Sequence, residues 1–500
     1  MKKRTFSLLA AMAVTGNLMA DEAALQAQIQ KLMERIEQLE KAQGLMQNET
    51  KTTLDQTRTT LQEIKEEQTA QSDMLSRVNA QSANDNIKWD IDFRSAVHSV
   101  GYAYTDHARN RTKISGNTYS SAYNSGADAG KSHTNPSLFT NRLWLGMGSK
   151  VNDDLFFYGQ LAAYYNWGAD TAAAEDKIWQ ESSRPNDVDI RLRQAYFVYK
   201  FGTDWDVPMS VSAGRRAASD GFLANHREGN AKPGSPLAHI TNMEVDAAMV
   251  QFDLDRVFLP GSYLKVVYGR AHDPADRSVT TNPYIDTAAE DNQVDFLVLP
   301  MSVYDDGQHK LMAQYSAIFN SKGEKPSADG TTTEIKTASG TTHLAAVSYQ
   351  LDGLSDENEF LEESTLFVST AMSMTDPDQG YRMLGSAENK TGYSFWAGFV
   401  FPDQITEGGR FGLEYNYGSK YWTPMTWAED STIGSKIATR GNAYEGYWNI
   451  PIVGKNLTAQ LRYTYLDHHY RANTTCYWDN PLVQNLDHAQ EFRAFVRYKY

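Results

Sequence analysis

The last eleven residues, Gln490–Tyr500, read QEFRAFVRYKY. Every second residue counted back from the end is apolar or aromatic: Tyr500, Tyr498, Val496, Ala494 and Phe492. Of the five interleaved residues, four are charged. A period of two predicts a strand with two unlike faces. Such a strand fits the wall of a membrane barrel and also the last strand of a soluble sandwich. The rest of the chain distinguishes between these two folds.

The composition favours a membrane barrel. Hydrophobic residues make up only 41% of the 500 positions, yet there are 28 Tyr, 20 Phe and 10 Trp. A transmembrane barrel turns one residue in two toward lipid and places aromatic girdles at both interfaces. After residue 20 no apolar run is long enough for a membrane helix, and the single Cys476 excludes an internal disulfide framework.

The sequence indicates neither an enzyme nor a metal or cofactor site. It contains no H-E-x-x-H, G-x-S-x-G or P-loop pattern, and no C-x-x-C-H for a c-type haem. The formal charge of −15 disfavours a nucleic-acid partner, because phosphates would be repelled. We therefore predict no catalytic residues, no metal and no cofactor.

Two segments precede the aromatic part of the chain. Residues 1–20 have a basic start, a short apolar centre and small residues before position 21, which predicts a secretory signal peptide. Residues 21–83 contain apolar positions spaced four and three apart, which predicts a coiled coil with one shift of frame. A lone charged helix or a disordered spacer is the alternative for this segment.

From residue 87 to 500, segments in which aromatic or apolar residues alternate with polar residues are separated by polar loops. We expect sixteen strands near residues 88–98, 140–150, 154–167, 189–202, 208–215, 246–255, 262–271, 292–303, 308–319, 341–351, 363–374, 391–401, 409–418, 441–450, 456–467 and 490–500. Short and long connections alternate, apart from a long turn at 352–362. This alternation favours an all-β transmembrane barrel of about 16 antiparallel strands over a propeller or a sandwich.

Assigning the aromatic face to lipid places a set of arginines on the inner face. Charges facing lipid at mid-bilayer would cost about 2–4 kcal/mol each. The pore-lining candidates are Arg94, Arg142, Arg191, Arg193, Arg462, Arg493 and Arg497. Five of them fall on neighbouring strands once the sheet closes, and a field across a constriction would filter solutes by charge. The alternative is that they pair with Asp90, Asp92 and Glu491 and only fill the interior.

The third long connection is the candidate for a loop that narrows the channel. It is dense in turn residues and in charges of both signs. The constriction-loop candidates are Arg215, Arg216, Asp220, Arg227 and Glu228. An ordinary surface loop is the alternative.

Several segments resemble a family of Gram-negative outer-membrane proteins that is catalogued only as a domain of unknown function. They include NIKWDIDFR at 86–94, NRLWLGMG at 141–148, GRR at 214–216, DGFLAN at 220–225 and GSPLAHI at 234–240. The layout is more loosely similar to general porins and to phosphate- and sugar-selective porins. The final strand resembles the terminal assembly signal of outer-membrane barrels, which would comprise Phe492, Val496, Tyr498 and Tyr500. The resemblance implies secretion and an outer-membrane location, and it implies no substrate.

The sequence as a whole predicts an outer-membrane channel for small hydrophilic, charged solutes, with the coiled coil in the periplasm. The expected partners are outer-membrane lipid, further copies of the chain (a trimer is favoured over a dimer) and peptidoglycan through the coil. Two alternatives stay open. One is a structural tether or surface adhesin with a plugged barrel, and the other is a sheath for a separate electron-transfer partner.

Overall fold

The computed structural model describes residue 33 and residues 87–167, 190–230, 232–272, 293–426, 429–472 and 480–500. The chain divides into two units, Met1–Asp85 and Asn86–Tyr500. The predicted signal peptide and coiled coil lie outside the described residues, apart from the helical residue 33. Among the described residues, no helix has the length and apolar character needed to cross a membrane.

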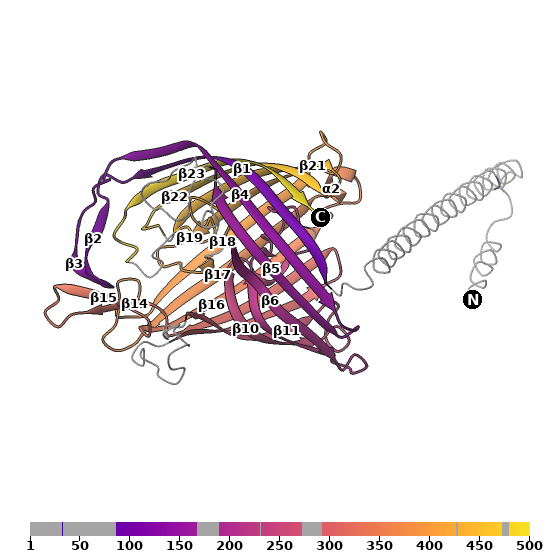
Figure 1. Ribbon diagram of the computed structural model, residues 1–500, viewed down its shortest axis with the longest axis horizontal. Coiled ribbons are helices and arrows are strands. Elements are labelled where there is room, and N and C mark those ends of the chain that lie inside the picture. Colours follow the sequence, from indigo (N-terminus) through magenta and orange to yellow (C-terminus); the bar gives the residue numbers. More distant parts are fainter. Residues whose placement is uncertain are drawn as a thin grey trace, which may run out of the picture. The chain divides into compact units, whose positions relative to one another are not determined.

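The second unit is a closed antiparallel barrel of sixteen strands (Figure 1). In order around the wall they are β1 (Lys88–Tyr104), β4 (Ser132–Lys150), β5 (Leu155–Asn166), β6 (Ile190–Phe201), β7 (Met209–Ala218), β10 (Thr241–Asp253), β11 (Tyr263–His272), β12 (Val294–Asp305), β13 (His309–Phe319), β16 (Gly340–Asp352), β17 (Thr365–Pro377), β18 (Lys390–Pro402), β19 (Arg410–Gly418), β21 (Gly441–Val453), β22 (Leu457–His468) and β23 (Leu486–Lys499). Pairing of β23 with β1 closes the sheet. The predicted fold and strand number are confirmed.

The connections alternate in length as the sequence predicts. Seven short turns join strands at the end where the chain terminates, and one of them carries the helix α2 (Glu359–Glu362). Asn358 caps this helix, because its side chain accepts a hydrogen bond from the backbone of Phe360 at 2.8 Å. The turn at 352–362, which is longer than the other turns at this end of the barrel, therefore contains a short helix.

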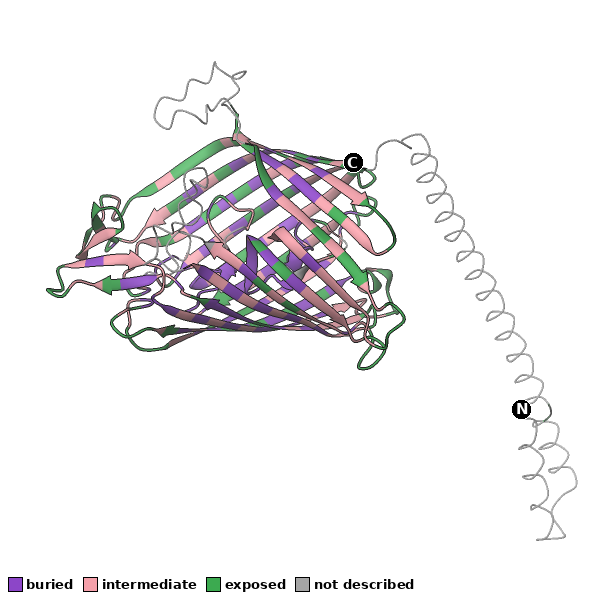
Figure 2. Cartoon of the chain, turned by 60° about the horizontal axis from the view of Figure 1, so that its bottom comes forward, coloured by how far each residue is buried: buried purple, intermediate pink, exposed green. Residues whose placement is uncertain are grey.

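The two faces of the strands differ in the way that the period of two predicts (Figure 2). On β1, Trp89, Ile91 and Phe93 are exposed on the outer face, whereas Asp92 and Arg94 are buried on the inner face. The last strand repeats the pattern, with exposed aromatic and aliphatic residues alternating with buried arginines. The outer face of the barrel is therefore apolar and suits lipid.

A second, four-stranded sheet lies at the opposite end of the barrel from the carboxy terminus (Figure 1). It is built from two long loops, with the order β14 (Gly323–Pro326), β15 (Thr332–Lys336), β3 (Thr118–Ser125) and β2 (Arg109–Ser115). This small sheet is not predicted from the sequence. Its strands are short and largely polar, so they lack the apolar alternation by which the barrel strands are found.

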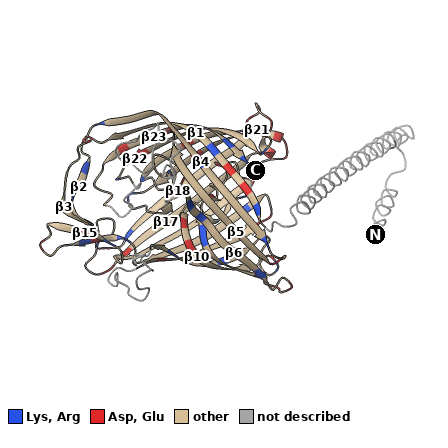
Figure 3. Ribbon diagram, in the orientation of Figure 1, with Lys and Arg blue, Asp and Glu red and all other residues tan. Residues whose placement is uncertain are grey.

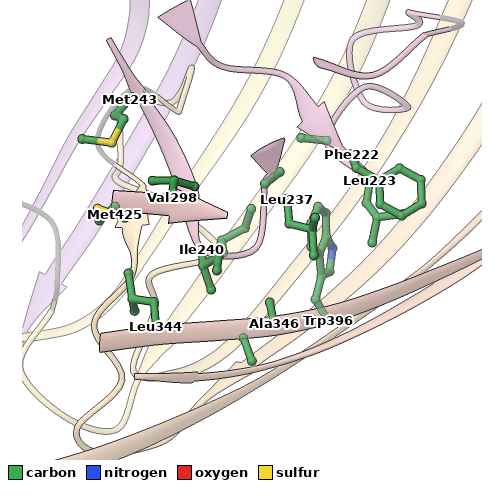
Figure 4. Close-up of a cluster of buried hydrophobic side chains, with 14 of the residues drawn as sticks. Phe222, Leu223, Leu237, Ile240, Met243, Val298, Leu344, Ala346, Trp396 and Met425 are labelled. Carbon is green, nitrogen blue, oxygen red and sulfur yellow. The ribbon is translucent and has the colours of Figure 1, made fainter. Parts of the chain in front are cut away.

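Two long loops fold into the barrel instead of outward. The third loop (residues 219–240) contains β8 (Gly221–Phe222) and β9 (Gly234–Leu237), and the seventh loop (residues 419–440) contains β20 (Met425–Thr426). The start of β10 pairs in parallel with β20. Apolar residues of both loops pack against the wall in one buried cluster (Figure 4), whose members include Phe222, Leu223, Leu237, Ile240, Trp396, Trp422 and Met425. The interior is thus partly filled by the protein's own chain.

Candidate functional site

The strand register places arginines directly opposite one another on the inner wall. Arg94 of β1 lies opposite Arg497 on one side and opposite Arg142 on the other. One further pair, Arg462 and Arg493, lies across β22 and β23. The five predicted neighbours therefore form one arginine wall on β22, β23, β1 and β4, and we use that name for them. Like charges in register are destabilising unless counter-charges lie close by.

Asp430 of the seventh loop supplies the central counter-charge. Its carboxylate forms ion pairs with Arg94, with Arg142 at 3.5 Å and with Arg493 at 3.2 Å. Its carbonyl oxygen also accepts a hydrogen bond from Arg462 at 2.9 Å. One loop residue thus contacts four of the five arginines, and burial makes these charge-assisted bonds stronger than at a surface.

Three further carboxylates complete the pairing of the wall. Asp92 pairs with Arg497 and, at 3.2 Å, with Arg142. Glu491 lies 3.3 Å from Arg493, and Glu228 of the third loop lies 3.7 Å from Arg462. The side chains of the five arginines are only 1–7% exposed. The arginine wall is therefore covered by the two loops and paired with carboxylates.

The same network continues across the interior to β19 and β21. Arg227 of the third loop pairs with Glu429 at 2.8 Å, and Lys436 of the seventh loop pairs with Glu414 at 2.6 Å and with Glu445. Figure 3 shows charged residues of both signs on the strands of the barrel. The connected ionic network contains seven bases, Arg94, Arg142, Arg227, Lys436, Arg462, Arg493 and Arg497, and seven acids, Asp92, Glu228, Glu414, Glu429, Asp430, Glu445 and Glu491.

The remaining two pore-lining candidates lie away from the arginine wall, on β6. Arg193 is buried, with its guanidinium 2.6 Å from Gln160, 3.1 Å from Glu244 and over the ring of Trp144. Arg191 keeps 56% of its side chain exposed and lies 3.6 Å from Glu244. A bulge between β5 and β6 accompanies this irregular stretch of the wall.

The five constriction-loop candidates separate into two groups. Arg227 and Glu228 are buried within the third loop and belong to the ionic network, and Asp220 lies at the start of the loop with a φ of 52°. Arg215 and Arg216 belong to strand β7 and not to the loop. Arg215 pairs with Asp246 at 3.0 Å, whereas Arg216 points to the interior and stacks over Tyr196.

Two histidines of the third loop attach it to the far wall. The ring of His226 stacks on Phe367 at 5.4 Å and bonds Gln350 at 2.9 Å. The ring of His239 is fully buried and bonds the hydroxyl groups of Ser369 and Ser394 at 2.7 and 2.8 Å. The loop therefore spans the interior from β7 and β10 to β16, β17 and β18.

The sequence pattern does not mark the seventh loop as a functional element. Asp430 and Lys436 resemble ordinary polar loop residues, because their partners are distant in the chain. A usable signal was nevertheless present. Trp422, Ile433 and Ile437 are apolar residues in a segment that a surface loop would make polar, and all three are buried.

The sequence model of a family described as "Protein of unknown function (DUF3373)" matches residues 132–500. No curated protein matches the chain.

Three solved structures illustrate the similarity of fold. OprB of Pseudomonas putida is 11% identical, with a TM-score of 0.44 over 85% of this chain and 96% of that one. OmpF of Salmonella typhi, in complex with daunomycin, is 12% identical, with a TM-score of 0.41 over 83% and 99%. OmpT of Vibrio cholerae is 12% identical, with a TM-score of 0.42 over 83% and 98%. The architecture itself is that of an outer-membrane β-barrel.

Proposed function

The chain belongs to the family described as "Protein of unknown function (DUF3373)", and because that description assigns no activity, we propose from the geometry that it is an outer-membrane channel narrowed by two inward loops. It passes small hydrophilic, charged solutes by diffusion. It has no catalytic role, and its long loops face the exterior while the coiled coil of residues 21–83 lies in the periplasm. The native form is a homo-oligomer, with a trimer favoured, and the coil reaches peptidoglycan.

One observation supports the channel most directly: the loops are fixed inside the barrel through charged groups. A sixteen-stranded barrel is wide enough for an aqueous passage unless something fills it. Here the third and seventh loops contribute Arg227, Glu228, Glu429, Asp430 and Lys436 to the ionic network. Asp430, at the centre of the arginine wall, remains 29% exposed to solvent. A charged group that keeps exposed surface within a barrel is a feature that a passage for hydrophilic solutes needs.

The balance of the network sets the expected selectivity. Seven bases and seven acids leave no net charge in the ionic network, so the native channel discriminates weakly between anions and cations and mainly by size. Asp92, Asp430 and Glu491 supply the negative charges that lie next to the arginine wall.

Planar-bilayer recordings test this proposal. The native protein should give stepwise conductance and a reversal potential close to zero in a potassium chloride gradient. Replacing Arg493 and Arg497 together with Ala removes two positive charges and should shift the reversal potential toward cation selectivity. Potassium phosphate and potassium sulfate would then show which anions pass. An unchanged reversal potential in the double variant would refute the role of the arginine wall.

The second candidate function is a plugged barrel that serves as a structural tether. It is favoured by the burial of the arginine side chains, which are 1–7% exposed. The same recordings separate the two functions, since a plugged tether gives no open-channel steps. Removal of residues 21–83 would then release the tether from the cell wall without changing the barrel.

A further inference from the structure

A cavity of about 220 Å³ lies inside the barrel, between the two ends of the third loop and the wall formed by β6, β7, β10, β11 and β12. It is distinct from the arginine wall, which lies on β22, β23, β1 and β4. Most of its lining is apolar and comes from inward-facing positions of the strands, among them Met243, Val245, Met249, Val267, Phe296 and Val298.

A single arginine is part of the lining. Arg216 reaches the cavity from β7, and its guanidinium lies 4.1 Å from the centroid of the Tyr196 ring, which also lines the cavity. One terminal nitrogen donates a hydrogen bond to the hydroxyl of Ser212, and the Nε atom is buried without a hydrogen-bond partner. Within the part of the chain that the structure describes, no carboxylate lies within ion-pair distance of Arg216.

The contrast with the other inner-wall arginines makes this position unusual. Each member of the arginine wall has at least one carboxylate within 4.0 Å, and Arg193 pairs with Glu244. Even the adjacent Arg215 is paired, with Asp246 at 3.0 Å. A largely buried cation normally has a counter-charge, because removing an unpaired charge from water is costly. The missing counter-charge at Arg216 can be supplied by a ligand.

We propose that this cavity is a binding site for a small amphipathic carboxylate, whose charged end pairs with Arg216 and whose apolar body fills the pocket. The guanidinium fork matches a carboxylate in a bidentate manner. The volume limits the apolar part, since an apolar cavity of about 150 Å³ holds benzene and drug-sized ligands need about 300 Å³ or more. The ligand is therefore an acid with one ring or a short branched chain.

The site does not depend on whether the barrel conducts. Its lining comes from the barrel wall and from the ends of the third loop, so a plugged tether would contain it as well. Binding to the purified protein in detergent therefore tests the site alone, and a failure there leaves the proposed channel untouched.

The experiment is a fluorine NMR titration of the full-length protein in detergent micelles, with para-fluorobenzoate as the probe. We expect saturable broadening of the probe signal that unlabelled benzoate reverses. The neutral para-fluorobenzyl alcohol lacks the charge, and fluoroacetate lacks the ring, so each should bind at least about tenfold more weakly. Broadening that rises without saturation, as partition into empty micelles does, would overturn the proposal.

Variants at two adjacent positions provide a matched comparison. Arg216→Gln should weaken para-fluorobenzoate binding by about tenfold or more, because it removes the charge-assisted bonds. Arg216→Lys keeps the charge and should retain part of the affinity. Binding by this variant would show that the loss in Arg216→Gln comes from the missing charge and not from a misfolded barrel. Arg215→Gln changes the neighbouring paired arginine and should bind like the native protein. Equal affinity in the native and Arg216→Gln proteins would refute the site.

A change on the apolar side tests the other half of the proposal. Val298→Phe adds volume to the floor of the cavity and leaves Arg216 in place. It should abolish saturable binding of para-fluorobenzoate while fluoroacetate behaves as before. Undiminished para-fluorobenzoate binding in this variant would show that the probe does not occupy the cavity.

Discussion

Arg94 lies directly opposite Arg497 in the register of β1 and β23, and it lies opposite Arg142 in the register of β1 and β4. Three guanidinium groups in a row across neighbouring strands would repel one another. The row is stable because Asp92 lies beside it on β1 and Asp430 reaches it from the seventh loop. The charge of the wall therefore helps to hold this loop in place, together with the apolar packing of Trp422.

Replacing Asp430 with Asn should release the seventh loop from the arginine wall. The change removes the counter-charge of Arg94, Arg142 and Arg493, and we expect a loss of about 2–3 kcal/mol of stability. The excess positive charge should shift the reversal potential of the channel toward anion selectivity and increase its conductance. Planar-bilayer recordings measure both quantities.

The control for this change is Asp378→Asn, which makes the same substitution at an exposed position in the loop between β17 and β18. It should leave conductance, selectivity and stability at native values. A reversal potential of Asp430→Asn equal to that of the control would contradict the assigned role of Asp430.

A double-mutant cycle should reveal the coupling of Lys436 with Glu414. The side chains are 4% and 1% exposed and lie 2.6 Å apart. Lys436→Met leaves the buried Glu414 without its basic partner and removes one of the bases beside Glu445, so it should cost about 3–5 kcal/mol. Adding Glu414→Gln should restore part of this loss, since Gln still accepts the hydrogen bond that Trp396 donates. Urea unfolding in lipid vesicles, followed by tryptophan fluorescence, measures the free energy of unfolding of the native protein, the two single variants and the double variant. Simple additivity of the two changes would disprove the coupling.

The sequence predicts the barrel well because each strand carries its own signal. From Trp89 to the last residue, lipid on one side and the interior on the other impose a period of two that is visible locally. The inner-face placement of Arg94, Arg142, Arg462, Arg493 and Arg497 follows from the same period, and closure of the sheet brings them together.

The partners of these arginines could not be predicted in the same way. The alternative interpretation of the sequence pairs the arginines with Asp90, Asp92 and Glu491 of their own strands. The ion pairs include Asp92 and Glu491, and the third loop adds Glu228. Asp430 is 336 positions from Arg94, and nothing local marks it as an interior residue. Contacts of this kind depend on the fold of the seventh loop, which in turn depends on packing of Trp422 against the wall.

Acid should weaken the attachment of the third loop at His239. Burial lowers the pKa of His239 to about 3, below the ordinary value of 6.5. Between these two values the unfolded chain binds the proton more readily than the folded chain, so stability falls as the pH decreases through this window. At pH 4 the loss should be roughly 3 kcal/mol relative to pH 7.

The variant His239→Gln isolates this contribution, because glutamine can bond the two serine hydroxyls and does not titrate. Urea unfolding midpoints between pH 7 and pH 4 should fall less in this variant than in the native protein. Parallel pH profiles of the two proteins would rule out His239 as the group responsible.

Alanine at Gly221 should displace the third loop from its position in the barrel. A Cβ atom at this residue would lie 2.3 Å from the carbonyl oxygen of Pro236, where β8 and β9 approach each other. The backbone must move to relieve the overlap, at a cost of about 1–3 kcal/mol. We expect larger single-channel conductance and trypsin cleavage after Arg227, which is only 2% exposed in the native protein. Gly148→Ala is the matched control, since its nearest neighbour would be 4.0 Å away. If trypsin cleaves both variants at the same rate, the close approach of β8 and β9 does not hold the loop in place.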